Sequence, residues 1–371
     1  MRVQIVDPSA YTPPYDHALC AALASAGAEV ELITSYFAYG AAPQPNGYTL
    51  RPSFYRHARG APGSALRTAT KLIEHVPDML AYRHRAQEAE IVHFQWLAVQ
   101  LLDRYLLPPR PTVLTAHDLL PREPRPTQVR AQRRLYGAVD AVVVHSEYGR
   151  RQLVEELGVD ADKVRVIHHG SFDYLTHIPA AELPAELGGA NGPVVLFFGL
   201  LRPYKGIDVL LDAWRAIGDP TVEGAELWIV GRRRMAIDSL VAGAPRGVKW
   251  VTRFVSDPEL AACFRRADVV VLPYLQTERF DFSGVLATAL AFGKPTVITD
   301  VGGFGEVTAA GAAHQVDPGD PDDLAQALRL LLGDRDERER LAEGARSAAA
   351  GPYSWSEAAR LTLALYRDLI R

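Results

Sequence analysis

The chain has 371 residues, a formal net charge of −4, 48% apolar residues and 23% charged residues. This composition is typical of a folded globular protein and excludes an intrinsically disordered chain, and the length favours two domains. The two cysteines, Cys20 and Cys263, lie far apart in the sequence, which excludes a disulfide framework or a cysteine-ligated zinc site. No apolar run reaches the roughly 18 residues of a membrane span, and the first residues lack the layout of a signal peptide. We therefore expect a cytoplasmic protein.

Basic residues are concentrated in the first half of the chain. Between Arg51 and Arg134 there are 14 Lys and Arg against 7 Asp and Glu. This surplus indicates either an anionic partner or a solvated, arginine-rich face. The negative overall charge and the absence of a recognition motif argue against nucleic acid as that partner.

Short apolar runs alternate with helical patterns through the first half. A helix is predicted over about 16–26, with Asp16 as its N-cap and Gly27 at its end. The apolar runs, each expected to form a buried parallel strand, are residues 3–6, 30–34, 91–94, 112–115, 141–144 and 164–167. This order predicts a doubly wound α/β domain.

A second set of strands follows a segment rich in proline and glycine. Residues 177–193 contain three prolines and three glycines without periodicity, which predicts a linker. A terminal helix is predicted from Trp355 to Arg371. The two domains should bind ligands in a cleft between the carboxyl ends of their sheets. The second sheet is predicted from the runs 194–198, 226–230, 248–251, 269–272 and 295–298.

Two strand-to-helix turns of the second half carry candidate binding residues. In FFGLLRPYKGIDVLL (197–211), Arg202 and Lys205 lie beside a helix N-terminus, where cations and free amides suit a diphosphate. In the second turn, Ser283 and Gly284 open a helix and expose its first amides. Solvated turns and simple helix capping are the alternatives.

Histidines follow two strands of the first half. His117 comes directly after the strand 112–115 and is expected to point into the cleft, while His93 ends the preceding strand and is a candidate for the acceptor pocket. A structural role is the alternative for both. The histidines have no coherent ligand spacing, so we expect no metal site.

In their order and spacing, several segments resemble a family 4 glycosyltransferase of the GT-B type, and the resemblance covers nearly the whole chain. It implies an α/β fold of two doubly wound, Rossmann-like domains facing across a cleft. The acceptor-side domain would be 1–175 together with a terminal helix, 353–371, that crosses back to it. A linker would span 176–192 and the donor domain 193–352. The segments are VLTAHDLLP, VDAVVVHSEYGRRQLVEELGV, FFGLLRPYKGIDVLLDAW, RRADVVVLPY and ALAFGKPTVITDVGGFGEV.

The resemblance implies a retaining, metal-independent transfer of a sugar from a nucleotide-diphosphate sugar to a hydroxyl of a glycan, a lipid-linked glycan or a small molecule. The donor, of UDP or GDP type, is a co-substrate, and no cofactor is expected. Arg202 and Lys205 match the basic pair that binds the donor diphosphate, although Leu200 stands where the arginine usually follows the strand-ending glycine. Fixed cations there would stabilise the negative charge of the departing diphosphate.

The resemblance also assigns roles to other residues. His117 would lie beside the donor sugar, and Asp281 or Glu278 would supply an acid to it. Thr288 stands where the family usually carries a ribose-binding glutamate. Expected donor-binding residues are Gly199, Arg202, Lys205, Gly231, Phe254, Phe282, Ser283, Gly284, Val285 and Thr288, and expected acceptor-side residues are Tyr11, Tyr15, His93 and Gln95.

Alternatives remain open for one segment and for the function. The stretch 64–85 is amphipathic and faces either the core or an anionic membrane, and the second case would give peripheral contact through the basic region 51–134 at the inner face of the membrane. A nucleotide-sugar epimerase on the same fold is one functional alternative. Another is a non-catalytic partner subunit, which Thr288 favours and the Arg202/Lys205 turn opposes. A dinucleotide dehydrogenase is disfavoured because no GxGxxG follows a first strand.

Overall fold

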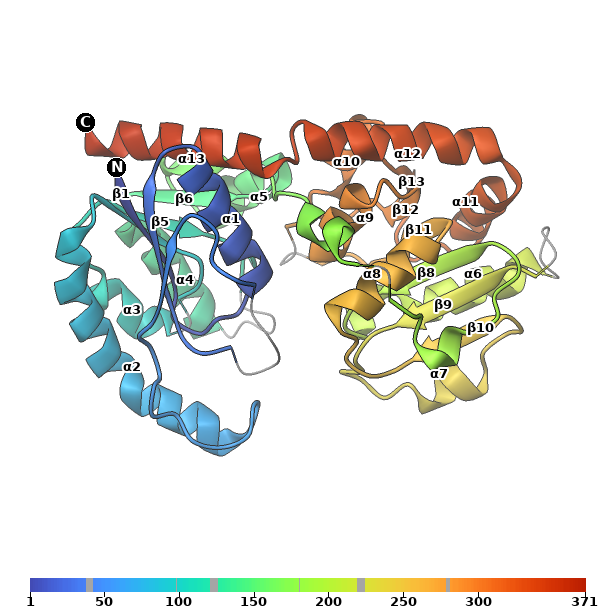
Figure 1. Cartoon of the computed structure of the whole chain (residues 1–371), viewed down its shortest axis with the longest axis horizontal. Coiled ribbons are helices and arrows are strands. Elements are labelled where there is room, and N and C mark those ends of the chain that lie inside the picture. Colours follow the sequence, from blue (N-terminus) through green and yellow to red (C-terminus); the bar gives the residue numbers. More distant parts are fainter. Residues whose placement is uncertain (38–42, 98, 121–125, 180, 219–223, 278–280) are drawn as a thin grey trace. The chain divides into compact units, whose positions relative to one another are not determined.

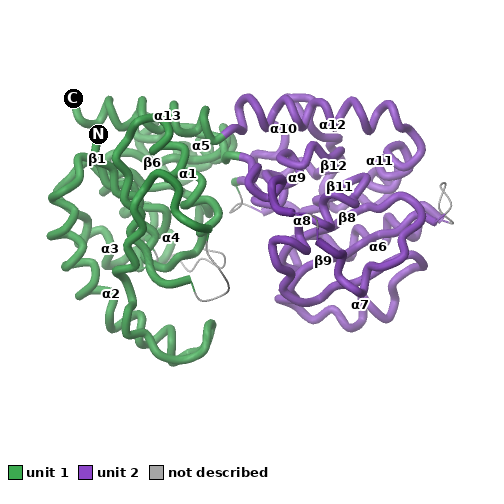
Figure 2. The backbone as a smooth tube through the Cα atoms, viewed as in Figure 1, with its two compact units in different colours: residues 1–170, 278–281, 355–371 green, residues 171–277, 282–354 purple. Residues whose placement is uncertain are grey.

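A computed structural model of the chain describes all residues except 38–42, 98, 121–125, 180, 219–223 and 278–280. The chain divides into two compact units (Figure 2). Unit 1 comprises Met1–Gly170, Glu278–Asp281 and Trp355–Arg371, and unit 2 comprises Ser171–Thr277 and Phe282–Ser354. The polypeptide therefore returns to unit 1 after completing unit 2.

Unit 1 is built on a parallel sheet with the strand order β3-β2-β1-β4-β5-β6-β7 (Figure 1). Its strands are β1 (Arg2–Asp7), β2 (Glu29–Thr34), β3 (Thr49–Pro52), β4 (Ile91–Phe94), β5 (Thr112–Thr115), β6 (Ala141–Val144) and β7 (Val164–Val166). Its helices are α1 (Pro13–Ser25), α2 (Ala65–Arg85), α3 (Gln100–Leu106), α4 (Pro126–Ala138), α5 (Glu147–Arg151) and α13 (Trp355–Ile370). The terminal helix α13 packs against α1, as expected for a helix that crosses back to the first domain.

Unit 2 contains a second parallel sheet, in the order β10-β9-β8-β11-β12-β13. Its strands are β8 (Val194–Phe198), β9 (Glu226–Val230), β10 (Val248–Val251), β11 (Val269–Leu272), β12 (Thr296–Thr299) and β13 (His314–Val316). Its helices are α6 (Ile207–Ile217), α7 (Asp238–Ala242), α8 (Asp257–Arg266), α9 (Gly284–Ala291), α10 (Phe304–Ala309), α11 (Pro321–Gly333) and α12 (Arg335–Ala350).

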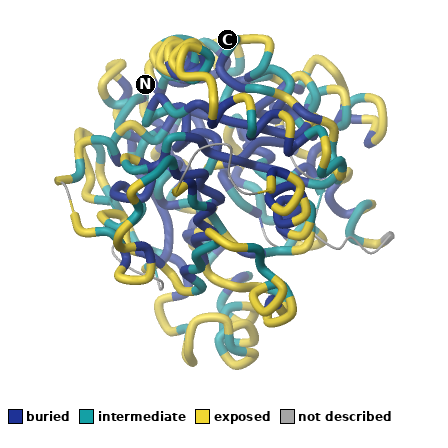
Figure 3. The backbone as a smooth tube through the Cα atoms, turned by 90° about the vertical axis from the view of Figure 1, so that its right-hand side faces the viewer, coloured by how far each residue is buried: buried dark blue, intermediate teal, exposed yellow. Residues whose placement is uncertain are grey.

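The central strands, in which apolar residues predominate, are buried (Figure 3), as is typical of a parallel sheet with helices on both faces. All four residues of β4, β5, β6 and β11 are buried. The predicted α/β class with two doubly wound parallel sheets is confirmed. Two strands, β3 and β13, were not predicted from the sequence. The helix α1 has Thr12 at its N-cap, so the assignment of Asp16 to that position was wrong.

The helix α2 differs from a core-facing amphipathic helix. Among the apolar residues of the stretch 64–85, Leu66, Leu72, Ile73 and Leu80 are between 51% and 75% exposed, and Met79 is buried. The helix instead buries His75, Met79 and Tyr82. The core-facing alternative is therefore wrong for these four residues.

Candidate functional site

The first group of candidate residues lies in unit 2, where β8 leads toward α6. Gly199 follows β8 with a φ of 117°, and Gly231 follows the neighbouring strand β9. A Cβ on Gly231 would lie 1.8 Å from the Gly199 carbonyl oxygen, so only glycine lets the two backbones approach this closely. A Cβ on Gly199 would lie 3.2 Å from Val285 Cγ2 and 3.5 Å from Lys205 Nζ. The backbone at Gly199 is therefore bordered by an ammonium group and by the first turn of α9.

Lys205 is held in a buried position by Tyr274, which follows β11. The Lys205 ammonium donates a hydrogen bond to the Tyr274 hydroxyl and lies 4.0 Å from the centroid of its ring. The same hydroxyl is 3.2 Å from Ser283 Oγ. Burial raises the pKa of Tyr274, so its hydroxyl remains protonated. Sequence reasoning missed Tyr274, although its position at the end of the RRADVVVLPY segment was an available signal.

The expected residues at the start of α9 are capping and packing groups. Ser283 is the N-cap, and its Oγ accepts a hydrogen bond of 3.2 Å from the Val285 amide. Thr288 is 4% exposed, and its hydroxyl donates a hydrogen bond of 2.8 Å to the Gly284 carbonyl oxygen. While this bond persists, the Thr288 oxygen can accept a hydrogen bond from another group but cannot donate one.

The remaining donor-side candidates have different surroundings. Arg202 is partly buried and directly precedes the 3₁₀ turn Pro203–Lys205. Phe282 is 8% exposed and stacks on Tyr353 with ring centroids 5.6 Å apart. Phe254 is 61% exposed on the loop between β10 and α8, and no contact described for it joins it to the Lys205 group.

Asp281 belongs to unit 1 and departs from its expected position beside a donor sugar. It is fully buried, and its Oδ2 accepts a hydrogen bond of 2.5 Å from the His145 amide. Its Oδ1 accepts one from the hydroxyl of Ser146, the N-cap of α5. A Cβ on Gly149 would lie 2.7 Å from Asp281 Oδ1, so the carboxylate lies directly against this helix terminus. Asp281 is thus engaged by α5, and the other expected acid, Glu278, lies outside the described residues.

A cluster of rings occupies the carboxyl edge of the unit 1 sheet, with Tyr15 at its centre. The Tyr15 ring centroid lies 4.6 Å from that of His117, 4.9 Å from His169 and 5.0 Å from Trp355. Tyr15 is 3% exposed, so it is a packing residue rather than a platform for a sugar ring. Tyr11 is 61% exposed, and its ring centroid lies 5.3 Å from that of a neighbouring tryptophan, Trp96.

A backbone carbonyl next to this cluster determines which nitrogen of His145 and of His117 donates a hydrogen bond. The Ile167 carbonyl can only accept, so His145 donates to it from Nδ1 over 3.0 Å. His145 Nε2 must then accept from His117 Nδ1 over 3.3 Å, which leaves His117 Nε2 as an acceptor. Gln95 lies 3.1 Å from that nitrogen, and its Nε2 has no partner within the described residues. Exchanging the oxygen and nitrogen of the Gln95 amide makes it the donor and satisfies both groups.

His93, His117 and His145 are neutral near pH 7. Burial lowers the pKa of His117 well below its usual value and lowers the pKa of His145 to about 4. His93 has a pKa of about 3 for the same reason. Its ring nitrogens lie 2.6 Å from Tyr366 Oη and 2.7 Å from Thr115 Oγ1. This arrangement differs from the expected one, because both nitrogens of His93 are committed to joining β4, β5 and α13.

Gln95 and His117 also border a cavity of about 70 Å³ at the ends of β4 and β5. Among the described residues, no group of three or more His, Cys, Asp or Glu side chains could hold a metal ion. The helices in that same part of the chain include none that is both long and apolar enough to cross a bilayer.

Two units, each built on a doubly wound parallel sheet, define the GT-B class of fold. The buried lysine lies at the first strand-to-helix turn of the second sheet. Solved structures share this fold. Sucrose-phosphate synthase from Thermosynechococcus elongatus superimposes with a TM-score of 0.77 at 20% identity, over 100% of this chain and 99% of that one. Anabaena HepE in complex with UDP-glucose gives a TM-score of 0.72 at 19% identity, over 98% of this chain and 100% of the other. These likenesses establish the fold.

The chain belongs to glycosyltransferase family 4. The model described as Glycosyltransferase Family 4 matches residues 15–171, and the model described as Glycosyl transferases group 1 matches residues 192–334. The D-inositol 3-phosphate glycosyltransferase of Xylanimonas cellulosilytica is 32% identical over 73% of this chain and 68% of that protein.

Other family members match over a smaller part of their length. The D-inositol 3-phosphate glycosyltransferase of Nocardia farcinica is 32% identical over 63% of this chain and 54% of that protein. The phosphatidyl-myo-inositol mannosyltransferase of Mycobacterium leprae is 34% identical over 60% of this chain and 58% of that protein. The chain thus spans little more than half of these two relatives.

Proposed function

We propose that the chain transfers a sugar from a nucleotide-diphosphate sugar to an acceptor hydroxyl, with retention of configuration at the anomeric carbon and without a metal ion. The observation that carries this proposal is the buried Lys205 ammonium beside the Gly199 backbone and the first turn of α9. The retaining course rests on membership of family 4. A glycan, a lipid-linked glycan or a small molecule would supply the acceptor hydroxyl.

Lys205 would stabilise the diphosphate as it leaves. Cleavage of the glycosidic bond places negative charge on the diphosphate, and a cation that is already fixed stabilises that charge without reorganising. Tyr274 fixes the ammonium through its hydroxyl and its ring face. Arg202, three residues earlier in the same turn, would supply the second cation. Such a pair performs the role that a divalent cation has in metal-dependent transfer.

The donor nucleotide is UDP or GDP in this proposal, and UDP is the first choice because HepE, which has the same fold, was solved with UDP and with UDP-glucose. Thr288 would accept a hydrogen bond from a ribose hydroxyl, since its own proton is bonded to Gly284. A neutral acceptor binds a hydroxyl more weakly than a carboxylate does.

The sugar and acceptor would meet unit 1 through Gln95, His117 and Tyr11. The neutral His117 has its Nδ1–H committed to His145, so Nε2 is the nitrogen that a sugar hydroxyl can approach in competition with Gln95. The exposed Tyr11 ring would pack on the acceptor. His93 and Tyr15 are outside this group, because both ring nitrogens of His93 are hydrogen-bonded within unit 1 and the Tyr15 ring is packed among other rings. Gln95 is also buried, but it borders the cavity beside His117.

Peripheral membrane contact through the basic region 51–134 is a further part of the proposal. The exposed face of α2 carries Leu66, Leu72, Ile73 and Leu80, and Arg67 and Lys71 lie on the same helix. Apolar side chains flanked by cations suit the interface of an anionic bilayer.

Calorimetric titration with UDP, GDP, ADP and TDP, without added metal, tests the donor site. We expect one nucleotide to bind at micromolar strength and Lys205→Ala to weaken it about 10- to 100-fold, the range for one charge-assisted contact. Lys249→Ala is the matched control, because Lys249, on β10, pairs with Glu226 on β9 and has no described contact with the Lys205 group. If no nucleotide binds the folded protein, the proposal fails and a non-catalytic subunit takes its place.

A further inference from the structure

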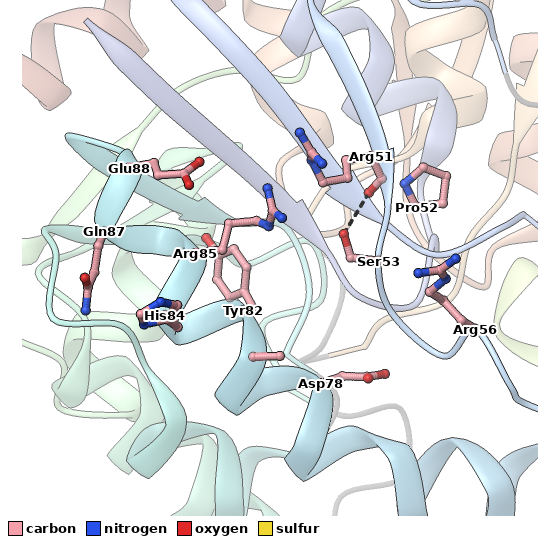
Figure 4. Close-up of a pocket in the computed structure, with 11 residues that line it drawn as sticks. Arg51, Pro52, Ser53, Arg56, Asp78, Tyr82, His84, Arg85, Gln87 and Glu88 are labelled. Carbon is pink, nitrogen blue, oxygen red and sulfur yellow. Dashed lines mark hydrogen bonds between the residues drawn. The ribbon is translucent and has the colours of Figure 1, made fainter.

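Unit 1 contains a second recess, which shares no lining residue with the groups described above. This β3–α2 hollow has a volume of about 530 Å³ and lies between the end of β3 and the second half of α2 (Figure 4). Arg51 and Ser53 border it from the β3 side, and Tyr82 and Arg85 border it from α2. Gln87 and Glu88, which follow α2, form part of the rim.

Three arginines, Arg51, Arg56 and Arg85, line the β3–α2 hollow. Figure 4 shows Arg51 reaching from β3 and Arg85 reaching from α2, with Arg56 at the opposite end. Arg51 has a counter-ion, because its Nε lies 2.5 Å from Glu31 Oε1. Within the described residues, the side chains of Arg56 and Arg85 have neither an ion pair nor a hydrogen bond. Two cations of the hollow therefore remain uncompensated by the protein.

The carboxylates of the hollow do not neutralise these arginines. Asp78 Oδ2 accepts a hydrogen bond of 2.7 Å from the Tyr55 amide, which directs this carboxylate to the backbone. Glu88 stands at the rim and is exposed. An incoming anion would thus meet Arg85 together with the outer nitrogens of Arg51, whose Nε is paired with Glu31. The rim would offer it Ser53 and Gln87 as polar partners.

We propose that the β3–α2 hollow binds a phosphate group carried by a polyol, at a site separate from sugar transfer. A phosphate offers three acceptor oxygens, so guanidinium forks from two elements can each bind it in a bidentate manner. The volume greatly exceeds that of a phosphate alone, and the hydroxyl, amide and carboxylate groups of the rim suit the hydroxyls of a polyol. The ligand is either a soluble polyol phosphate or the headgroup of a phospholipid, since both present this chemistry.

Titration of the full chain with glycerol 3-phosphate and with myo-inositol 1-phosphate tests the site. We expect Arg85→Gln to weaken binding by about tenfold, the effect of removing one charge-assisted bidentate contact. Arg83→Gln is the matched control: it removes the same charge from the same helix, but Arg83 donates to the Tyr105 carbonyl and does not line the hollow. Binding to Arg83→Gln should stay within about twofold of the unmodified protein, because screening limits the effect of an exposed charge.

Vesicles of phosphatidylcholine with phosphatidylglycerol distinguish the two sources. If the ligand is a headgroup, the vesicles compete with glycerol 3-phosphate and Arg85→Gln lowers vesicle binding. If the ligand is soluble, glycerol 3-phosphate binds and the vesicles do not compete.

Two results together overturn the proposal. The first is that neither phosphate binds with a dissociation constant below about 10 mM, which is no stronger than a non-specific ion contact. The second is that Arg85→Gln binds vesicles as well as the unmodified protein does. The proposal also fails if Arg83→Gln and Arg85→Gln lose affinity equally. UDP titration of the same variants separates this result from the donor site: Arg85→Gln should bind UDP normally, and Lys205→Ala should bind glycerol 3-phosphate normally.

Discussion

Tyr274 connects two of the groups on which donor binding would depend, Lys205 and Ser283. Its hydroxyl accepts a hydrogen bond from Lys205 and lies 3.2 Å from Ser283 Oγ, while its ring lies beneath the ammonium. A residue outside the usual set of charged ligands therefore sets the position of the cation. Its contribution can be separated into that of the hydroxyl and that of the ring.

Tyr274→Phe should weaken nucleotide binding by about threefold to tenfold, the effect expected from losing one hydrogen bond to a charged group. The ring remains beneath the ammonium, so the loss should be smaller than for Lys205→Ala. Calorimetric titration with UDP measures both variants, and thermal unfolding verifies that each is folded. An equal loss for the two variants would contradict this division of roles.

The buried carboxyl groups of Asp7 and Asp16 interact at the start of α1. Asp7 accepts hydrogen bonds from the amides of Ser9 and Tyr11, and burial raises its pKa. The pKa of Asp16 is raised well above its usual value, first by burial and then by the charge of Asp7. A raised carboxyl pKa means that the folded state holds the proton more tightly than the unfolded state, so stability falls as the pH rises above about 3.8.

Asp16→Asn should therefore increase the free energy of unfolding at pH 8. The gain should be about 1 kcal/mol or more for each pH unit by which folding raises the pKa of Asp16. The amide is neutral at every pH and can still donate to Asp7. The gain should shrink as the pH approaches 4, where Asp16 is protonated in the unmodified protein. Urea unfolding at pH 8 and pH 5 measures the difference, and an identical change at both pH values would exclude the titration of Asp16 as its cause.

Asp281 illustrates the limit of sequence reasoning at single residues. The family resemblance gave it the role of an acid beside the donor sugar, but the structure engages it with His145 and Ser146, more than 130 residues earlier. Tertiary hydrogen bonds of this kind leave no periodic signal in the chain. Lys205, in contrast, was predictable because strand, turn and helix follow one another locally.

At the scale of elements, the start of α5 depends on a carboxylate from a distant segment. We expect Asp281→Ala to lower the free energy of unfolding by about 1–3 kcal/mol, because the buried His145 amide and Ser146 hydroxyl lose their partner. Urea unfolding followed by circular dichroism measures this change. A catalytic acid would behave differently: its variant would unfold like the unmodified protein and lose turnover only.

The helix α2 exposes apolar side chains that a membrane interface would cover. Ile73 is 75% exposed, so Ile73→Glu should leave the free energy of unfolding within about 0.5 kcal/mol of its original value. It should also reduce sedimentation with anionic vesicles severalfold, because it places a negative charge at the contact. Val241→Glu, at a 42% exposed position of unit 2, is the control. Equal vesicle binding by Ile73→Glu and Val241→Glu would exclude α2 as the contact.

At the scale of the whole molecule, the two sheets could be predicted because apolar residues predominate in most strands and form short runs. β8 (VVLFF) and β9 (ELWIV) were placed at their observed bounds. β3 (TLRP) and β13 (HQV) lie at sheet edges and contain polar residues, so they offer no such run. The β3–α2 hollow was not predictable either, since it depends on β3 and on the packing of α2 beside it.

The return of the chain to unit 1 has a consequence for biosynthesis. Residues 355–371 leave the ribosome after all of unit 2, yet Tyr366 is hydrogen-bonded to His93 and the Trp355 ring packs against Tyr15. Domains usually fold in order as they emerge from the ribosome, which adds about 5–20 residues per second. Part of the interior of unit 1 must therefore stay uncovered until residues 355–371 have been made. Unit 2, whose segments are all made earlier, can reach its final packing first.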